Sequence, residues 1–171
     1  MKRGLCLLLA CFLLIGGTSC REAGQGRRYF AYLDAPAKAE LTGKINSLCF
    51  SATLETAGRG ADSTVDAALT FVAPDSLAGV TLVCRNGTWS ASLGLLTGEA
   101  DGEGLARVAT LLTEERAVRS SKSEGNCTVL TLSDGATLVL DAKTGAPLRA
   151  AWSDGGRAIE VVIVSWKERS L

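Results

Sequence analysis

Segments in which apolar and polar residues alternate run through most of this chain, and they limit what it can fold into. In residues 37–45, Leu41 and Ile45 alternate with charged and hydroxyl side chains, and residues 48–55 and 65–74 continue the pattern. Side chains of a β-strand point alternately to the two faces of a sheet. The pattern is therefore typical of strands with one buried face and one solvated face.

Turn residues separate these segments in the way that β-hairpins require. Asn86-Gly87 lies between the apolar segments 79–85 and 88–96, and this dipeptide favours a type I′ turn because both central residues take positive φ. The other turn signals are Asn46-Ser47, Asp134-Gly135 and residues 154–156. Together these signals predict about nine strands, joined mainly as antiparallel hairpins.

Residues 104–115 show the period of a helix instead. Leu105, Val108, Ala109 and Leu112 fall at positions i, i+3, i+4 and i+7, which places them on one face. We therefore expect a mainly β fold of the α+β class, with a curved or split antiparallel sheet and one covering helix. No linker or internal repeat divides the chain.

The N-terminus has the layout of a secretory signal peptide. Lys2 and Arg3 precede the unbroken apolar run Leu5–Ile15, which is shorter than the about 20 residues needed to span a bilayer. Small residues at 16–19 then lead to Cys20. This predicts export of the protein from the cytoplasm.

The sequence around Cys20 resembles a bacterial lipoprotein signal, in which the cysteine becomes the new N-terminus and its sulfur takes a diacylglyceryl group. Gly17 departs from that pattern, because the position usually holds an aliphatic residue. Ordinary signal-peptidase cleavage is the alternative, since Gly17 and Ser19 also satisfy its small-x-small rule. Two or more acyl chains would anchor the protein to membrane lipid, on the outer face of the cell membrane or another envelope membrane.

On this interpretation the chain has three parts: a signal peptide at residues 1–19, a membrane-proximal tether at 20–34 and a β domain at 35–171. Arginines of the tether could lie against anionic headgroups. Tyr29, Phe30 and Tyr32 either sit at the membrane interface or begin the fold.

Composition excludes several kinds of chemistry. The chain has 18 basic and 18 acidic residues and no histidine, and loss of Lys2 and Arg3 with the signal leaves a formal charge of −2. Without histidine there is no Ser-His-Asp triad, no Cys-His pair and no imidazole metal site. The balanced charge argues against nucleic acid as a partner. No activated nucleophile or paired carboxylate remains, so we expect no enzyme, no cofactor and no metal.

The cysteines divide into distinct groups. Cys6 and Cys11 lie in the signal, and Cys20 is the candidate site of lipid attachment. Cys49, Cys84 and Cys127 remain, widely spaced and without a CxxC pair. In an exported domain, these three cysteines could form one disulfide and leave one free thiol, or they could form no disulfide, and the sequence leaves both alternatives open.

The C-terminal strands resemble a recurrent hairpin of the LolA/LolB-like superfamily of lipoprotein carrier and sensor domains. The matching elements are a strand ending at Asp141, the turn 143–147 with its Thr-Gly-x-Pro sequence, a strand entered through Leu148-Arg149, a glycine turn and a final apolar strand. The resemblance implies an unclosed β-barrel whose concave apolar side holds acyl chains. The chain lacks the carriers' long N-terminal helix and full set of lid helices, which favours a tethered acceptor, sensor or binding protein over a shuttle.

Two functions follow as expectations. The first is a membrane-anchored protein that binds a hydrophobic or lipid ligand in the sheet concavity, with Phe50, Leu69, Phe71 and Leu82 as the residues expected to line it. The alternative is a structural or protein-interaction lipoprotein of the cell envelope without a ligand. Inward-facing apolar residues serve a core and a pocket equally, so the sequence separates the two only weakly.

Overall fold

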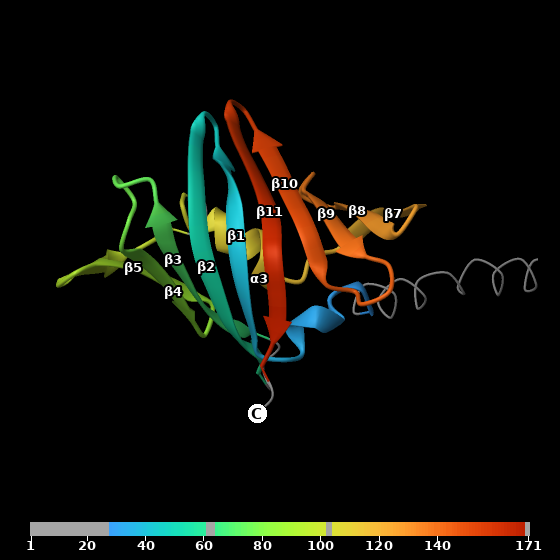
Figure 1. Cartoon of the computed structure of the whole chain (residues 1–171), viewed down its shortest axis with the longest axis horizontal. Helices are drawn as coiled ribbons and strands as arrows, with labels where there is room; N and C mark the ends of the chain where they lie inside the picture. Colours follow the sequence, from blue (N-terminus) through green and yellow to red (C-terminus); the bar gives the residue numbers. More distant parts are fainter. Residues whose placement is uncertain (1–27, 61–63, 102–103, 170–171) are drawn as a thin grey trace, which may run out of the picture.

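The structure is a computed structural model that describes residues 28–60, 64–101 and 104–169. The signal peptide and Cys20 lie outside these residues. One antiparallel sheet of eleven strands dominates the described chain, with the strand order β6-β5-β4-β3-β2-β1-β11-β10-β9-β8-β7 (Figure 1). The strands are β1 (Ala37–Ile45), β2 (Leu48–Arg59), β3 (Val65–Ala73), β4 (Val80–Arg85), β5 (Thr88–Leu93), β6 (Leu96–Glu99), β7 (Val118–Glu124), β8 (Cys127–Leu132), β9 (Thr137–Asp141), β10 (Pro147–Asp154) and β11 (Arg157–Glu168).

The strand order shows two meanders joined side by side. Strands β1 to β6 run outward in one direction and β11 back to β7 in the other, and the two sets meet where β1 pairs with β11. The outermost strands β6 and β7 do not pair with each other, so the barrel is open. The expected fold class, a curved and unclosed antiparallel sheet, is confirmed.

Two regions that the alternating pattern did not mark as strands lie at the edges. Strand β6 follows a turn at Gly94-Leu95, and β7 is almost wholly exposed. An edge strand that buries neither face places no demand for alternation on its sequence. This accounts for the eleven strands observed against about nine expected.

The turns have the conformations that their residues favour. Asn86 and Gly87 have φ of 50° and 76°, and the β4–β5 hairpin that they predict is confirmed. After β9, the Asp141 carboxylate accepts hydrogen bonds from the backbone N–H groups of Lys143 (2.9 Å) and Thr144 (2.8 Å). These hydrogen bonds hold the pKa of Asp141 below its usual value.

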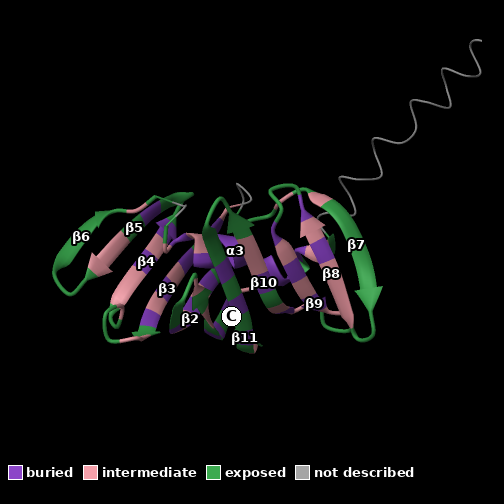
Figure 2. Ribbon diagram, turned by 90° about the horizontal axis from the view of Figure 1, so that it is seen from above, coloured by how far each residue is buried: buried purple, intermediate pink, exposed green. Residues whose placement is uncertain are grey.

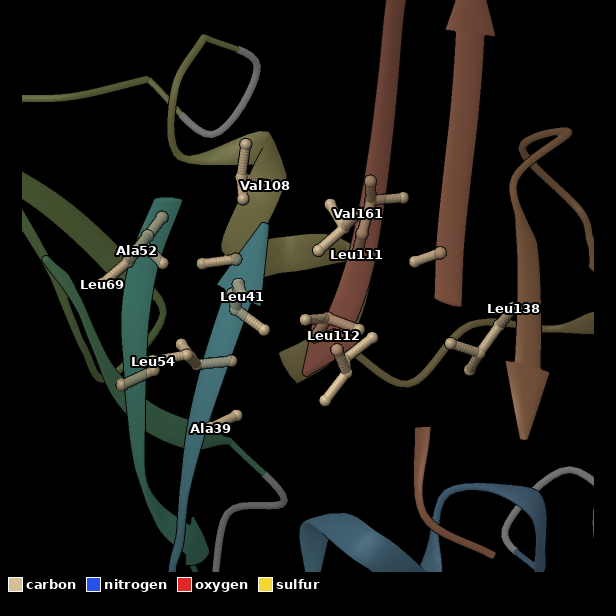
Figure 3. Close-up of a cluster of buried hydrophobic side chains, with 14 of the residues drawn as sticks. Ala39, Leu41, Ala52, Leu54, Leu69, Val108, Leu111, Leu112, Leu138 and Val161 are labelled. Carbon is tan, nitrogen blue, oxygen red and sulfur yellow. The ribbon is translucent and has the colours of Figure 1, made fainter. Parts of the chain in front are cut away.

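The α-helix α3 (Arg107–Thr113) lies against the concave face of the sheet. Figure 2 shows the sheet arching around it, with β6 and β7 at opposite ends. In Figure 3, Val108, Leu111 and Leu112 of α3 lie among the side chains of the central strands, including Leu41 of β1 and Val161 of β11. All of these side chains are buried.

The helix is shorter than the expected segment 104–115 because the chain turns through residues 104–106 and is extended at Glu114. It is also buried on more than one side, so its threonines need internal partners. Thr110 donates its hydroxyl hydrogen to the carbonyl of Arg107 (3.2 Å), and Thr113 donates to Ala109 (3.0 Å). Such bonds to preceding carbonyls let a threonine lie in an apolar environment.

The folded part of the chain begins within the segment expected to be a tether. Phe30, Tyr32 and Leu33, in and beside the 3-10 helix η1 (Ala31–Leu33), are buried in the core. The Tyr32 ring meets the Trp166 ring edge-on at 5.4 Å between centroids. Of the two roles left open for these aromatic residues, the structure favours the beginning of the fold.

Candidate ligand-binding face

The four residues predicted to contact a ligand lie together on the concave side of the sheet. Phe50 comes from β2, Leu69 and Phe71 from β3, and Leu82 from β4. The Phe50 and Phe71 rings meet edge-on at 5.6 Å, and Leu69 stands opposite Leu82 in the register of β3 and β4. All four are at most 4% exposed and belong to the core cluster. Contact between them and a ligand stays a prediction.

Beside this cluster, an apolar strip runs along the concave side of β4 and β5. Three cross-strand pairs form it: Val80 with Leu93, Leu82 with Ala91, and Cys84 with Trp89. Leu82 is buried at its centre, whereas Leu93 at one end is half exposed. Cross-strand pairs of this kind form a continuous surface because their side chains lie on one face. The strip connects two hollows.

The first, which we name the helix-end hollow, lies where α3 ends over the β3–β5 region. It has a volume of about 460 Å³, which falls within the range of small-molecule sites. Its walls are Thr64, Val65, Cys84, Gly87, Trp89, Thr113, Glu114 and Glu115. Val65, Cys84 and Trp89 are its apolar side chains. Burial raises the pKa of the Cys84 thiol, so this side chain is a neutral part of the wall.

The second, which we name the lip hollow, lies at the other end of the strip. Its volume is about 280 Å³, and it is lined by Val80, Ala91, Ser92, Leu93, Leu96, Thr97 and Gly98. None of these residues is charged. An uncharged hollow can accept an aliphatic chain without the cost of removing water from an ion.

The carboxylate of Glu115 in the helix-end hollow is tied to a buried arginine. The Arg59 side chain is only 7% exposed and contacts both the Glu115 carboxylate and Asp34 Oδ1, the latter at 2.9 Å. It also donates a hydrogen bond to the carbonyl of Phe30 (3.1 Å). Arg59 therefore joins the end of α3 to the N-terminal segment.

A second arginine holds the same end of the helix from the other side. Arg116 donates to the carbonyl of Thr110 (2.8 Å) and to the carboxylate of Glu114 (3.2 Å), and it lies 3.3 Å from Asp134. Asp134 also pairs with Arg107 at the start of α3, at 2.6 Å. The helix is thus tied to the rest of the fold by ion pairs at both ends.

A larger hollow of about 550 Å³ lies elsewhere, over β2, β3 and β4, and it has a different character. Glu55, Asp66, Arg85 and Arg169 are among its lining residues. Glu55 is already paired with Lys38 (2.9 Å) and with Arg169 (3.0 Å). Burying these charges under an apolar ligand would cost more than the contact would return. The two concave hollows suit such a ligand better.

The described residues contain no group of three or more His, Cys, Asp or Glu side chains that could hold a metal ion. Cys49, Cys84 and Cys127 are free thiols on β2, β4 and β8. Asp101, in the acidic stretch before the helix, accepts a hydrogen bond from the backbone N–H of Gly104 (2.8 Å) and so shapes a turn. Among the same described residues, no helix is long and apolar enough to cross a membrane.

Two features of this face were not found from the sequence. The helix-end hollow depends on where α3 ends over β5, which no local pattern specifies. The lip hollow did leave a signal, because residues 86–98 contain no charged side chain. In the sequence, however, that signal looks like the alternation of an ordinary hairpin strand.

No protein-family model matches the sequence, and no curated protein matches it either. Solved structures do share its shape. An uncharacterised conserved protein from Thermus thermophilus superposes with a TM-score of 0.56 and 16% identity, over 87% of this chain and 88% of that one. MucB gives a TM-score of 0.54 and 15% identity over 90% of this chain, which spans only 60% of MucB.

A domain named for outer membrane lipoprotein sorting, from Vibrio parahaemolyticus, superposes with a TM-score of 0.51 and 8% identity, over 85% of this chain and 92% of that domain. At such identities the likeness shows a shared fold and nothing finer, because one fold hosts many functions. At the level of the fold, it confirms the resemblance carried by the C-terminal strands.

Proposed function

We propose that this chain, which has the LolA-like half-barrel fold, is an exported, non-catalytic lipoprotein that binds a hydrophobic ligand on its concave face. The observation that carries the proposal is the apolar strip of β4 and β5, which has a hollow at each end. Strand pairing forms the strip, and α3 covers the concave face beside it. The name of the Vibrio parahaemolyticus domain, which refers to lipoprotein sorting, supports the same class of ligand.

The ligand would enter at the lip hollow, which is open and uncharged, and extend along β5 toward Trp89. Leu82 lies between the two hollows and is only 2% exposed. A ligand long enough to occupy both hollows would therefore push aside the side chain of Leu82 and those of its neighbours Phe50, Leu69 and Phe71. In this way the four predicted residues become contacts of the bound state.

Binding can be tested with the mature chain and a fluorescent single-chain fatty acid. Ala91→Phe places a large ring in the wall of the lip hollow, at the middle of the strip, and we expect it to weaken binding about tenfold or more, a change of about 1.4 kcal/mol. Ser90→Phe is the matched control, because Ser90 is the adjacent residue of β5 on the opposite, exposed side. Equal affinity of the two variants, or no binding by the wild type, would contradict the proposal.

Membrane attachment is a separate part of the proposal and has its own test. Cys20 lies outside the described residues, and the proposal that it is acylated rests on the sequence before it. Replacing Cys20 by serine removes the sulfur that would carry the diacylglyceryl group. We expect Cys20→Ser to move the protein from the membrane fraction to the soluble fraction, and an unchanged membrane fraction would count against lipidation.

A second candidate function is the binding of a partner protein. MucB, which shares the fold over part of its length, has been solved in complex with MucA(peri). In the present chain β7 is an edge strand with its outer side unpaired, and such an edge can receive an extended segment of another chain. Crosslinking in intact cells, followed by mass spectrometry, would show a partner contacting residues 118–124. A crosslinked partner together with a failed fatty-acid assay would favour this function over the first.

A further inference from the structure

The turn between β5 and β6 carries three leucines that face solvent. Leu93, Leu95 and Leu96 are 50%, 102% and 74% exposed. Leu93 and Leu96 form the last cross-strand pair of the hairpin, and Gly94, with φ of +60°, turns the chain between them. We name these three residues the leucine tip. In Figure 2, β5 and β6 lie at one end of the arched sheet, away from α3.

The hairpin that carries the leucine tip is uncharged over most of its length. Between Arg85 and Glu99, residues 86–98 contain no acidic or basic side chain. A Cβ atom added at Gly94 or Gly98 would meet no other atom within 4 Å, so the turn projects into open space. On one side the β3–β4 turn, which contains Asp75, lies against Leu93, since a Cβ atom added at Gly79 would be 3.7 Å from the Leu93 side chain. The nearest hydroxyl groups of the hairpin belong to Ser92 and Thr97, which form the next cross-strand pair. The tip is therefore an apolar protrusion from an uncharged stretch of hairpin, with one acidic residue, Asp75, in the neighbouring turn.

The other exposed apolar residues differ from this arrangement. Val162 and Val164 lie on β11, where their neighbours on the same exposed face include Glu160, and the remaining two, Leu48 and Val72, lie on different strands, β2 and β3. The opposite edge of the sheet, β7, carries Arg119, Lys122 and Glu124. Charges on an edge strand discourage association with other apolar surfaces. On the opposite edge strand, β6, the one charged residue is Glu99, which lies at the end of the strand away from the tip, and the three leucines are close to one another in the turn.

We propose that the leucine tip is a membrane-docking element, which inserts its side chains into the boundary between the headgroups and the acyl chains of a bilayer. A contiguous exposed apolar patch marks an interaction site, and a bilayer fits this one better than a protein. A standard protein interface covers about 800 Å² on each partner and is anchored by Trp, Tyr or Arg. The leucine tip is small and contains no Trp, Tyr or Arg. Insertion into lipid requires only apolar side chains and a backbone whose hydrogen bonds are paired.

Docking in this way would have a consequence for ligand binding, which rests on the proposed function above. Leu93 and Leu96 belong both to the leucine tip and to the lip hollow. With the tip inserted, the hollow would open directly onto the bilayer. An amphiphile could then pass between membrane and protein without crossing water. Leu95 does not line the hollow, so its replacement tests docking without altering the ligand site.

The test uses an unacylated chain that begins at residue 20 and carries Cys20→Ser, since every described strand and helix lies within residues 28–169. The probe is a vesicle of phosphatidylcholine alone, so that attraction of the tether arginines to anionic lipid plays no part. We expect the chain to float with the vesicles, and Leu95→Ser to lower its partition coefficient about tenfold, equivalent to about 1.4 kcal/mol. Leu95→Phe should restore binding, because it returns an apolar side chain to the tip.

Val164→Ser is the matched control, since Val164 is 61% exposed on another part of the sheet, and its partition coefficient should stay within about twofold of the wild type by the same energy scale. Binding should also persist when salt rises from about 0.1 M to about 1 M, which shortens the screening length from about 10 Å to about 3 Å. The proposal is overturned if the wild type does not float or if Leu95→Ser floats equally well. It is also overturned if sedimentation shows a dimer that Leu95→Ser dissociates, because the tip would then bind a second copy.

Discussion

At the scale of single residues, this fold depends on a few charged side chains placed among apolar ones. Arg59 and Arg116 have side chains that are 7% and 9% exposed, yet each has carboxylate partners at the surface. A buried guanidinium is tolerated when several of its N–H groups have acceptors. Neither residue stood out in the sequence, because an arginine beside turns and strands looks like any solvated charge until its partners are known.

Arg59→Met tests this role. Methionine keeps much of the aliphatic bulk but leaves Glu115, Asp34 and the carbonyl of Phe30 without their partner. Because both carboxylates are partly exposed, water recovers some of the loss, and we expect the free energy of unfolding to fall by about 1–3 kcal/mol. Urea denaturation measures this change. Lys38→Met is the control, since both side chains of the Lys38–Glu55 pair are exposed. If Lys38→Met lowered the free energy of unfolding as much as Arg59→Met, Arg59 would have no special role.

Asp141 gives a pH-dependent prediction. Hydrogen bonds from the backbone of Thr144 and Lys143 lower the pKa of its carboxyl from the ordinary value of 3.8. A carboxyl whose pKa is lower in the folded state stabilises the fold above the unfolded-state pKa, and the stabilisation disappears as pH falls through the folded-state pKa. The wild type should therefore be more stable than Asp141→Ala at pH 7, and the difference should shrink below about pH 4. Urea midpoints across this range measure it, and a difference independent of pH would contradict the assignment.

At the scale of elements, the hairpins could be predicted and the pairing between distant strands could not. Asn86-Gly87 and Asp134-Gly135 fix neighbouring strands through local backbone conformation, so the sequence alone suffices there. The pairing of β1 with β11 joins residues more than a hundred positions apart and leaves no local signal. The hydrophobic period of α3 predicted the helix but not which strand it would end over, and for this reason the helix-end hollow was missed.

Gly43 shows how closely the central elements approach each other. A Cβ atom at this position of β1 would collide with the carbonyl oxygen of Glu160 on β11 and come within 2.8 Å of the Phe50 ring on β2. Backbone on one side and a buried ring on the other leave no room to adjust. We expect Gly43→Ala to lower the free energy of unfolding by about 1–3 kcal/mol. Gly98→Ala should change it far less because nothing lies within 4 Å there, and thermal unfolding of the two variants would compare them directly.

At the scale of the whole molecule, the concave face of the sheet has a covered centre and a partly uncovered side. The central strands are covered by α3 and by the buried residues of the N-terminal segment, whereas the concave side of β4 to β6 is partly uncovered. The predicted fold included the curvature and a single covering helix. It did not indicate that the four predicted ligand contacts, Phe50, Leu69, Phe71 and Leu82, would be packed in the core, because inward apolar side chains look the same in a core and in a pocket.

Hydrogen exchange of backbone amides tests this division, because protection follows burial and hydrogen bonding of each region. Strands β1 and β11 are paired on both sides and lie at the centre of the sheet, so their amides should exchange last. Strand β6 is exposed along its length and unpaired on its outer side, so residues 96–99 should exchange among the first. If the two meanders were independent units, β11 would lose protection without β1, and that result would contradict a single core.

Addition of the fatty acid should slow exchange in β4 and β5 first, because these strands carry the apolar strip, and slowing confined to β7 would instead point to the partner-binding function.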